Sequence, residues 1–392
     1  MQKVVDVGEL AGAATLAWRA RSGDAQTACV GWRDIEAHLP VERDTIFRIA
    51  SMTKPITSVA ALMLVDESRI TMTDSIARFA PEFSQMRVLR APNGPLDETD
   101  PAERPITFED LLTHRSGLTY ADFHRGPIAQ AYRDALGDDI DSNLAPDEWI
   151  ARLAQLPLIG QPGSAMYYGC SPDLLGFLIA RIEGASLGEV LKRRIFDPLG
   201  MKDTSFLVPK EKRARRGSAY GFDEEGRLTK RVTRAGVFVA ERPDDMAFES
   251  GGAGLWSTVD DYLKFARLFL GDGSVDGVRI LRPETLAAMM TNQLSDSQPA
   301  NPAWLGLKPG RGFGLGVSVV LETNQADFMR RGSVGTVSWP GAFGGWWQAD
   351  PREGSVMIFL AHNMVNMAQM AKGIGLGVWG AIDSFQTLAL VS

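Results

Sequence analysis

Apolar and polar residues follow two different periods along the chain. From Ala11 to about Arg33, two apolar runs flank the turn Ser22-Gly23-Asp24, which predicts a β-hairpin. From Ile56 onward, apolar residues recur at helical spacing, and the segments 173–184 and 186–201 predict two further helices. Glycine-punctuated runs near the end of the chain predict consecutive short strands before a last helix; they cover residues 312–322, 332–339, 344–351 and 354–364.

The order of these elements predicts the fold class. A hairpin and a helix come first, and a strand meander with a helix comes last. Residues 1–70 and 171–392 are therefore expected to build one domain on a single antiparallel sheet flanked by helices. Between them, residues 71–170 contain many loop residues around short helical runs, which predicts a mainly helical domain. We expect an α+β protein of the α/β-sandwich type.

Composition narrows the function classes. The 392 residues exceed one typical core of roughly 150 residues, and 45% apolar with 23% charged residues is ordinary for a globular protein. A net charge of −7 disfavours nucleic acid and anionic membranes as partners. The N-terminus lacks the apolar core of a signal peptide, so we expect a cytoplasmic protein. Cys29 and Cys170 give no disulfide framework and the four histidines show no ligand spacing, so no metal or other cofactor is expected.

The first chemical signal is a serine and a lysine three residues apart, Ser51 and Lys54. If a helix starts at or just after Ser51, Pro55 falls in or near its first turn, and the lysine amine can reach the hydroxyl. A serine becomes a nucleophile only when a base takes its proton, and a lysine beside a buried helix start meets that need. The alternative is that Ser51 caps the helix and Lys54 is a solvated surface charge.

A rival nucleophile is Ser186 in the G-x-S-x-G segment 184–188. That pattern requires a strand leading into the serine and a helix leading out, whereas here a predicted helix leads in. Gly184 fits a helix C-cap, and Ser186 with Glu189 fits a capping box. We favour the helix cap, and the alternative, with His362 as the partner of Ser186, is kept for testing.

Several short segments, taken together and in order, resemble a known family. They are Ser51–Lys54, Leu111–Leu118, Pro162–Cys170, Phe196–Met201, Gly251–Thr258 and Trp339–Gly341. This series resembles the serine β-lactamase and penicillin-binding-protein superfamily, in particular its class C-like carboxylesterases (family VIII esterases) and related transacylases. The resemblance implies a β-lactamase/transpeptidase-like fold and catalysis through an acyl-enzyme on Ser51.

The second motif of that family is Tyr-x-Asn, whose tyrosine shares proton transfer with the lysine. Tyr167 and Tyr168 both compete for the role, and the spacing from Pro162 favours Tyr168. Cys170 stands where lactamases have the asparagine that binds the substrate amide. This departure weakens a lactamase assignment.

The third motif, Lys-Thr-Gly in lactamases, resembles Trp339-Pro340-Gly341 here. The cation that would bind a substrate carboxylate is missing, which favours a neutral substrate. The resemblance implies an oxyanion hole formed by the backbone N–H groups of Ser51 and Ala342. This agrees with the chemistry of Pro340, which has no N–H and cannot be a donor. Gly341 is expected to let the strand edge approach the substrate. The residues predicted to contact substrate are Trp339, Gly341, Phe343 and Cys170.

The sequence thus predicts a serine carboxylesterase for small short-acyl or aryl esters, with Ser51, Lys54 and Tyr168 as catalytic residues. A β-lactamase, amidase or transacylase would use the same residues, a hydrolase using Ser186 would not, and a non-catalytic binding protein on the same scaffold would acylate neither serine. The expected partner is a small-molecule ester, without nucleic acid or membrane, and a homodimer is left open. His114 is interpreted as structural, and the basic run 210–216 as an exposed segment.

Overall fold

The largest β-sheet of the protein contains strands from both the N-terminal and the C-terminal part of the chain. The computed structural model describes residues 1–137, 141–231, 247–295, 300–301 and 310–391. Its largest sheet has the strand order β14-β15-β16-β17-β18-β1-β2-β3, with antiparallel neighbours throughout. The strands are β1 (Gly12–Arg19), β2 (Ala25–Asp34), β3 (Leu39–Pro40), β14 (Arg311–Phe313), β15 (Ser318–Val320), β16 (Val337–Gly341), β17 (Gly345–Asp350) and β18 (Ser355–Ala361).

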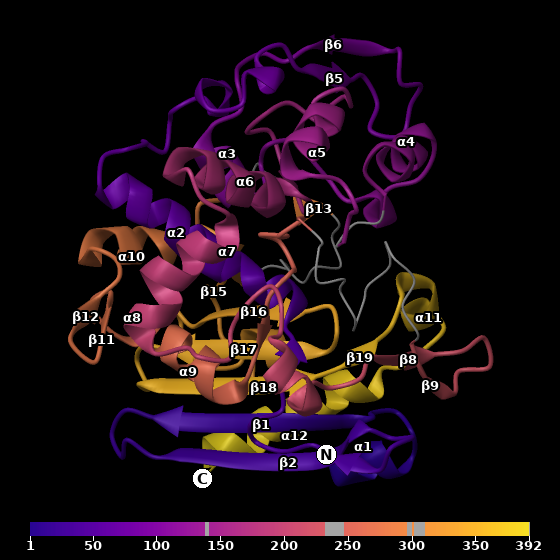
Figure 1. Cartoon of the computed structure of the whole chain (residues 1–392), viewed down its shortest axis with the longest axis vertical. Coiled ribbons are helices and arrows are strands. Elements are labelled where there is room, and N and C mark those ends of the chain that lie inside the picture. The colour runs from indigo at the N-terminus through magenta and orange to yellow at the C-terminus, as the bar shows by residue number, and fades with distance from the viewer. Residues whose placement is uncertain (138–140, 232–246, 296–299, 302–309, 392) are drawn as a thin grey trace.

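The predicted hairpin and the predicted antiparallel sheet are both confirmed. Strand β1 pairs with β2 on one side and with β18 on the other, where Ala13 lies opposite Ala361 and Arg19 opposite Ser355. Because of this pairing, the N-terminal hairpin continues the C-terminal meander in one sheet (Figure 1).

Alternating side chains of the sheet bury against helices on its two faces. On one face, Trp346 and Phe359 pack with the C-terminal helix α12 (Gly377–Val391) and lie near α1 (Gln2–Asp6). On the other face, Trp347 and Ile358 belong to the core shared with α2 (Thr53–Asp66) and α9 (Val259–Ala266). Adjacent residues of a strand point to opposite faces, so each strand contributes to both cores.

Short helices lie above the sheet in the view of Figure 1. They are α3 (Phe108–Leu112), α4 (Pro127–Leu136), α5 (Pro146–Leu153) and α6 (Ser171–Glu183). Helix α6 is apolar on most sides and packs against α2 and α3. The remaining helices are α7 (Leu187–Leu191), α8 (Asp197–Leu199), α10 (Pro283–Met289) and α11 (Met367–Ala371). The remaining strands are β4 (Phe47–Arg48), β5 (Arg87–Leu89), β6 (Thr99–Pro101), β7 (Met166–Tyr167), β8 (Tyr220–Phe222), β9 (Leu228–Lys230), β10 (Trp256–Ser257), β11 (Ser274–Val275), β12 (Val278–Arg279), β13 (Ala300–Asn301) and β19 (Asn363–Met364).

Two predicted elements are divided in the structure. The run 312–322 forms β14 and β15 rather than one strand, because the Gly314 N–H donates to Val317 O across a turn in which Gly316 has φ +90°. The predicted helix at 186–201 contains α7, a π-helical turn at Lys192–Phe196, and α8, which ends at the left-handed Gly200.

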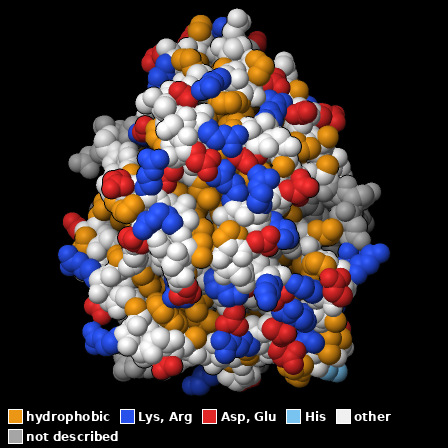
Figure 2. Space-filling model, turned by 60° about the vertical axis from the view of Figure 1, so that its left-hand side comes forward, with side chains coloured by type: hydrophobic (Ala, Val, Ile, Leu, Met, Phe, Trp, Pro, Cys, Tyr) orange, Lys and Arg blue, Asp and Glu red, His pale blue; other side chains and the backbone are white. Residues whose placement is uncertain are grey.

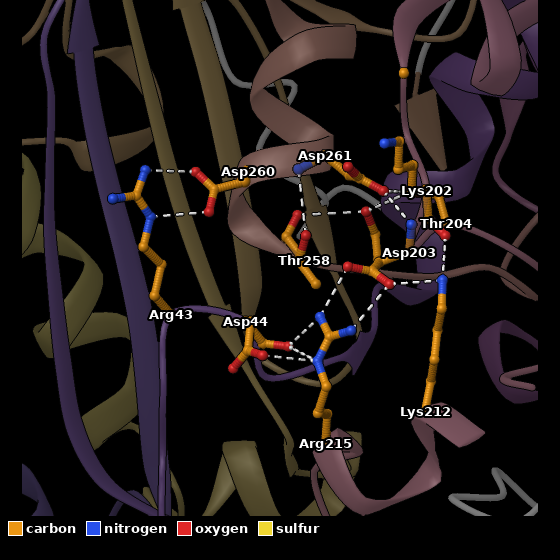
Figure 3. A network of polar contacts seen from close by, with 12 residues as sticks. Arg43, Asp44, Lys202, Asp203, Thr204, Lys212, Arg215, Thr258, Asp260 and Asp261 are labelled. Atoms are coloured by element: carbon orange, nitrogen blue, oxygen red, sulfur yellow. Dashed lines mark hydrogen bonds and ion pairs between the residues drawn. The ribbon is translucent and has the colours of Figure 1, made fainter. Parts of the chain in front are cut away.

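The surface carries mixed charges. Figure 2 shows basic and acidic side chains interspersed over one face of the molecule. Below α9, Asp203 accepts from Arg215 at 2.7 Å and pairs with Lys212 at 2.9 Å (Figure 3). Arg215 also pairs with Asp44. Two of the basic side chains in the run 210–216 therefore form ion pairs, which fix this segment against the rest of the protein.

Candidate active site

Ser51 lies in a single turn of 3₁₀ helix, Ala50–Met52, directly before α2. The preceding residue, Ala50, is fully buried and has φ +45°, a left-handed conformation that costs a non-glycine residue energy and is often retained at functional sites. Pro55 falls in the first turn of α2, as predicted. The alternative in which Ser51 caps the helix is wrong, because Met52 occupies the N-cap position and no side chain caps it.

Lys54 is not a solvated surface charge, since only 1% of it is exposed. Its Nζ lies 3.2 Å from Ser51 Oγ, 2.9 Å from the carbonyl oxygen of Gly252 and 3.4 Å from Tyr120 Oη. The predicted contact between the lysine amine and the serine hydroxyl is therefore present. Three oxygen atoms thus surround the Lys54 nitrogen, which has three positions for an N–H group or a lone pair.

Tyr168, rather than Tyr167, contacts this centre. Lys54 Nζ lies 4.6 Å from the centroid of the Tyr168 ring, and the indole N–H of Trp339 donates to Tyr168 Oη at 3.3 Å. The Tyr167 ring instead lies against Gly160 and is partly buried, which raises the pKa of its hydroxyl. The structure thus places Tyr168 beside Lys54 and Trp339.

His114 supports the Tyr168 ring from the side. The two ring centroids are 4.7 Å apart, and His114 Nδ1 accepts the Gly169 N–H at 3.4 Å. Burial, assisted by the charge of Lys54, holds the pKa of His114 well below its usual value, so the ring is neutral. This placement agrees with a structural role.

Residues from three further segments complete the polar centre, and sequence reasoning missed their part in it. Tyr120 donates its hydroxyl proton to Asp173 Oδ2 at 3.0 Å. Asp173 Oδ1 accepts from the Ser250 hydroxyl and from the Gly252 N–H at 3.0 Å. We call Ser51, Lys54, Tyr120, Asp173, Ser250 and Gly252 the buried network. An aspartate in the first turn of the apolar helix α6 was the one local signal for it.

The third motif lies on β16, next to the turn that carries Ser51. A Cβ atom on Gly341 would lie 2.5 Å from the carbonyl oxygen of Ile49. Glycine is thus required here for the approach of the strand to the backbone of Ile49, two residues before Ser51, whereas the sequence suggested an approach to substrate. Ala342 is exposed in the tight turn after β16, where the Gly344 N–H donates to Gly341 O.

The predicted substrate-contacting residues lie in different surroundings. Trp339 borders Tyr168, and Cys170 is buried at the start of α6. Phe343 is 1% exposed and packs with Ala50 and Trp256, which favours a core role over substrate contact. Three further aromatic side chains are also fully buried: Trp256, Trp346 and Trp347.

Ser186 has the surroundings of a helix cap. Helix α6 ends at the left-handed Gly184, and Ser186 and Glu189 form a capping box at the start of α7, as predicted. His362, the partner that a Ser186 hydrolase would need, has both ring nitrogens occupied by the backbone of Arg48 and Gly217. Burial lowers the pKa of His362 to about 4.

The described residues contain neither a metal-binding cluster nor a membrane-spanning helix. Across residues 1–137, 141–231, 247–295 and 310–391, no group of histidine, cysteine, aspartate and glutamate side chains is arranged to hold a metal ion. In the same ranges, none of the helices has the length and hydropathy that a bilayer crossing requires.

Comparison with known proteins places this geometry in a family. The family model described as Beta-lactamase matches residues 2–376. An uncharacterized protein of Mycobacterium tuberculosis is 43% identical over 374 residues, which are 94% of this chain and 90% of that protein. Esterase EstB of Burkholderia gladioli is 30% identical over 353 residues, 85% of this chain and 81% of EstB.

A solved structure agrees with these relatives. EstCE1, described as a hydrolase with promiscuous acyltransferase activity, superposes with a TM-score of 0.76 at 25% identity, covering 97% of this chain and 96% of its own. The match extends over the sheet and the helices above it. The chain is therefore an enzyme of the β-lactamase family of serine hydrolases.

Proposed function

We propose that the protein is a serine carboxylesterase that hydrolyses small short-acyl or aryl esters through an acyl-enzyme on Ser51. The observation that carries this proposal is the buried amine of Lys54, 3.2 Å from the Ser51 hydroxyl. A serine hydroxyl attacks a carbonyl carbon when a positioned base accepts its proton, and Lys54 is positioned to be that base.

In the proposed acylation step, the Ser51 O–H bond breaks and its proton passes to Lys54, while Oγ bonds to the ester carbonyl carbon. The π electrons of the carbonyl move to its oxygen. We propose that the backbone N–H groups of Ser51 and Ala342 donate hydrogen bonds to this oxyanion. The bond to the alkoxy oxygen then breaks, and the leaving alcohol takes a proton from the Lys54–Tyr168 pair. Water repeats the sequence on the acyl-enzyme and releases the acid.

An uncharged substrate is favoured by the residues around Tyr168. Trp339 offers an indole N–H where lactamases offer an ammonium group, and a neutral donor attracts a substrate carboxylate less. The Phe123 and Trp339 rings lie 5.7 Å and 5.5 Å from the Tyr168 ring, and Phe123 is partly exposed. An apolar acyl or aryl group suits such aromatic surroundings.

Acyl transfer is a second candidate function. The fold neighbour EstCE1 is described as a hydrolase with promiscuous acyltransferase activity, and the same acyl-enzyme could pass its acyl group to an alcohol in place of water. The two outcomes are separated by adding a simple alcohol during ester turnover and measuring by mass spectrometry whether free acid or a new ester forms.

The nucleophile is tested by intact-mass spectrometry after exposure to a fluorophosphonate, with p-nitrophenyl butyrate turnover on the same samples. Wild type and Ser186→Ala should gain one label and keep turnover, whereas Ser51→Ala should lose both. Loss in Ser186→Ala alone would refute the proposal. A comparison of p-nitrophenyl butyrate with a chromogenic cephalosporin then separates an esterase from a lactamase.

A further inference from the structure

The amine of Lys54 has a fixed rotation because two of its three neighbours can act only as acceptors. The carbonyl oxygen of Gly252 has no proton to donate. The Tyr120 hydroxyl already gives its proton to Asp173, so its contact with Lys54 uses an oxygen lone pair. Two N–H groups of Lys54 are thus committed, and the third position of the nitrogen faces Ser51 Oγ.

This arrangement fits both protonation states that the proposed reaction needs. A neutral amine has two N–H groups and one lone pair, and the lone pair then faces the Ser51 hydroxyl. After the proton has moved, the third N–H occupies that position and faces Ser51 Oγ. The amine needs no rotation between the two states, which is the pre-organisation that efficient proton transfer requires.

Asp173 supplies a negative charge on the far side of Tyr120. The carboxylate is 1% exposed, and its partners are neutral donors: Ser250, the Gly252 N–H and Tyr120. Burial raises the pKa of the Asp173 carboxyl, while the Lys54 charge and the three donors oppose that rise. In the described ranges no lysine or arginine forms an ion pair with Asp173, so its charge faces Lys54 through one hydroxyl group.

We propose that Tyr120 and Asp173 are positioning residues for Lys54. Tyr120 fixes the rotation of the amine, and the Asp173 carboxylate stabilises the ammonium that forms when Ser51 loses its proton. This inference rests on the proposed esterase function. The logic is that of a serine–base–acid triad, in which the buried carboxylate orients the base and stabilises its charged form without taking the proton itself.

Gly252 is the steric condition for this arrangement. A Cβ atom at that position would lie 2.6 Å from Asp173 Oδ2 and 2.7 Å from Tyr120 Oη. Any larger residue would push apart the two oxygens that share the Tyr120 proton. The backbone of Gly252 also contacts both charged residues of the buried network, because its N–H donates to Asp173 and its carbonyl oxygen accepts from Lys54.

The test compares Tyr120→Phe, Asp173→Asn and the control Tyr167→Phe, whose side chain lies against Gly160. The kcat and KM for p-nitrophenyl butyrate are measured across pH, with rates normalised to the sites that a fluorophosphonate labels. The titratable groups around Lys54 are His114, Tyr120, Tyr168 and Asp173. Normalisation removes any fraction of a variant that has failed to fold.

Tyr120→Phe should lower kcat on the order of 100-fold with KM little changed, since the amine loses its alignment. Asp173→Asn should also lower kcat and move the rising limb of the kcat/KM profile to lower pH by about one unit, because an anion stabilises the protonated form of a neighbouring base. Tyr167→Phe should match wild type.

A normal kcat in Tyr120→Phe, or an unmoved limb in Asp173→Asn, would overturn the inference, since a structural role alone changes the active fraction and not the profile. The Ser51→Ala variant separates this from failure of the proposed function. If Ser51→Ala is inactive while both positioning variants behave as wild type, only the present inference falls. If Ser51→Ala still turns over ester, the esterase proposal falls with it.

Discussion

Two polar networks among the described residues, each built around an aspartate and a lysine, lie in different surroundings. In the buried network, Asp173 is 1% exposed; in the surface network below α9 (Asp44, Asp203, Lys212 and Arg215), the side chain of Asp203 is 21% exposed (Figure 3). Burial raises the pKa of Asp173. Burial also acts to raise that of Asp203, but the hydrogen bonds and charges of Arg215 and Lys212 outweigh it and lower the pKa.

The difference lies in how each carboxylate is partnered. Asp203 contacts two cations directly, so its charge is used locally to hold the segment around residues 203–215. Asp173 contacts neutral donors, and its charge is separated from Lys54 by the Tyr120 hydroxyl. A carboxylate held in this way is less useful as a structural clamp and more useful next to a group that gains and loses a proton.

The largest expected effect comes from removing the lysine amine of the buried network, with the lysine of the surface network as the control. Lys54→Met should lower kcat/KM for p-nitrophenyl butyrate by about 1000-fold, because the proposed base is lost. Lys212→Met should leave turnover unchanged, since Lys212 contacts Asp203 and the carbonyl oxygen of Lys202. Circular dichroism controls for folding. Equal losses in both variants would mean that the buried lysine acts through stability alone.

The next effect concerns two arginine–aspartate pairs that differ mainly in exposure. Arg48 binds Asp141 at 2.6 Å and 2.7 Å with both side chains buried, whereas Arg215 and Asp203 are partly exposed. Arg48→Met should cost about 3–5 kcal/mol in the free energy of unfolding, because it leaves a buried carboxylate uncompensated. Arg215→Met should cost about 1 kcal/mol or less. Urea unfolding measures both, and similar costs would contradict the assignment by burial.

The contrast between local and distant contacts also explains what the sequence could predict. Ser51 and Lys54 are one helical turn apart, so their contact could be predicted from their spacing. The helix cap at Ser186 could be predicted from the capping-box pattern of Ser186 and Glu189. The hairpin, the antiparallel sheet and the last helix followed from hydrophobic period and are confirmed. The boundaries at residues 70 and 170 and the catalytic roles stay predictions.

The buried network could not be predicted in the same way. Tyr120 is 53 residues from Asp173, and Ser250 is 77 residues from it. No period links these positions, and each had an ordinary local interpretation, such as an acidic first turn for Asp173 in α6. Gly252 belonged to a recognised segment, but only the approach of Asp173 and Tyr120 in space shows why it must be glycine.

The two carboxylates should also give opposite slopes of stability against pH. The pKa of Asp203 is lower in the folded state than in the unfolded state, so the stability that Asp203 contributes is present above the unfolded-state pKa and is lost as pH falls through the folded-state pKa. In Asp203→Asn, the free energy of unfolding should therefore fall less steeply as the pH is lowered. The pKa of Asp173 is raised, so wild type loses stability as pH rises from the unfolded to the folded value. Asp173→Asn should remove that loss. Urea unfolding across the acid range measures both slopes, and slopes of the same sign would contradict the comparison.

The smallest expected effect is on the stability of Lys212→Met, the variant that serves above as the activity control. The Lys212 amine lies 2.9 Å from Asp203 and is partly exposed, so water and salt screen most of its attraction. We expect a loss of about 0.5 kcal/mol in the free energy of unfolding at low salt, and almost none at about 1 M salt, where the screening length falls to about 3 Å. A larger loss that salt does not change would mean that the surface network is as well shielded from solvent as the buried one. Partnering rather than burial would then remain as the physical difference between Asp203 and Asp173.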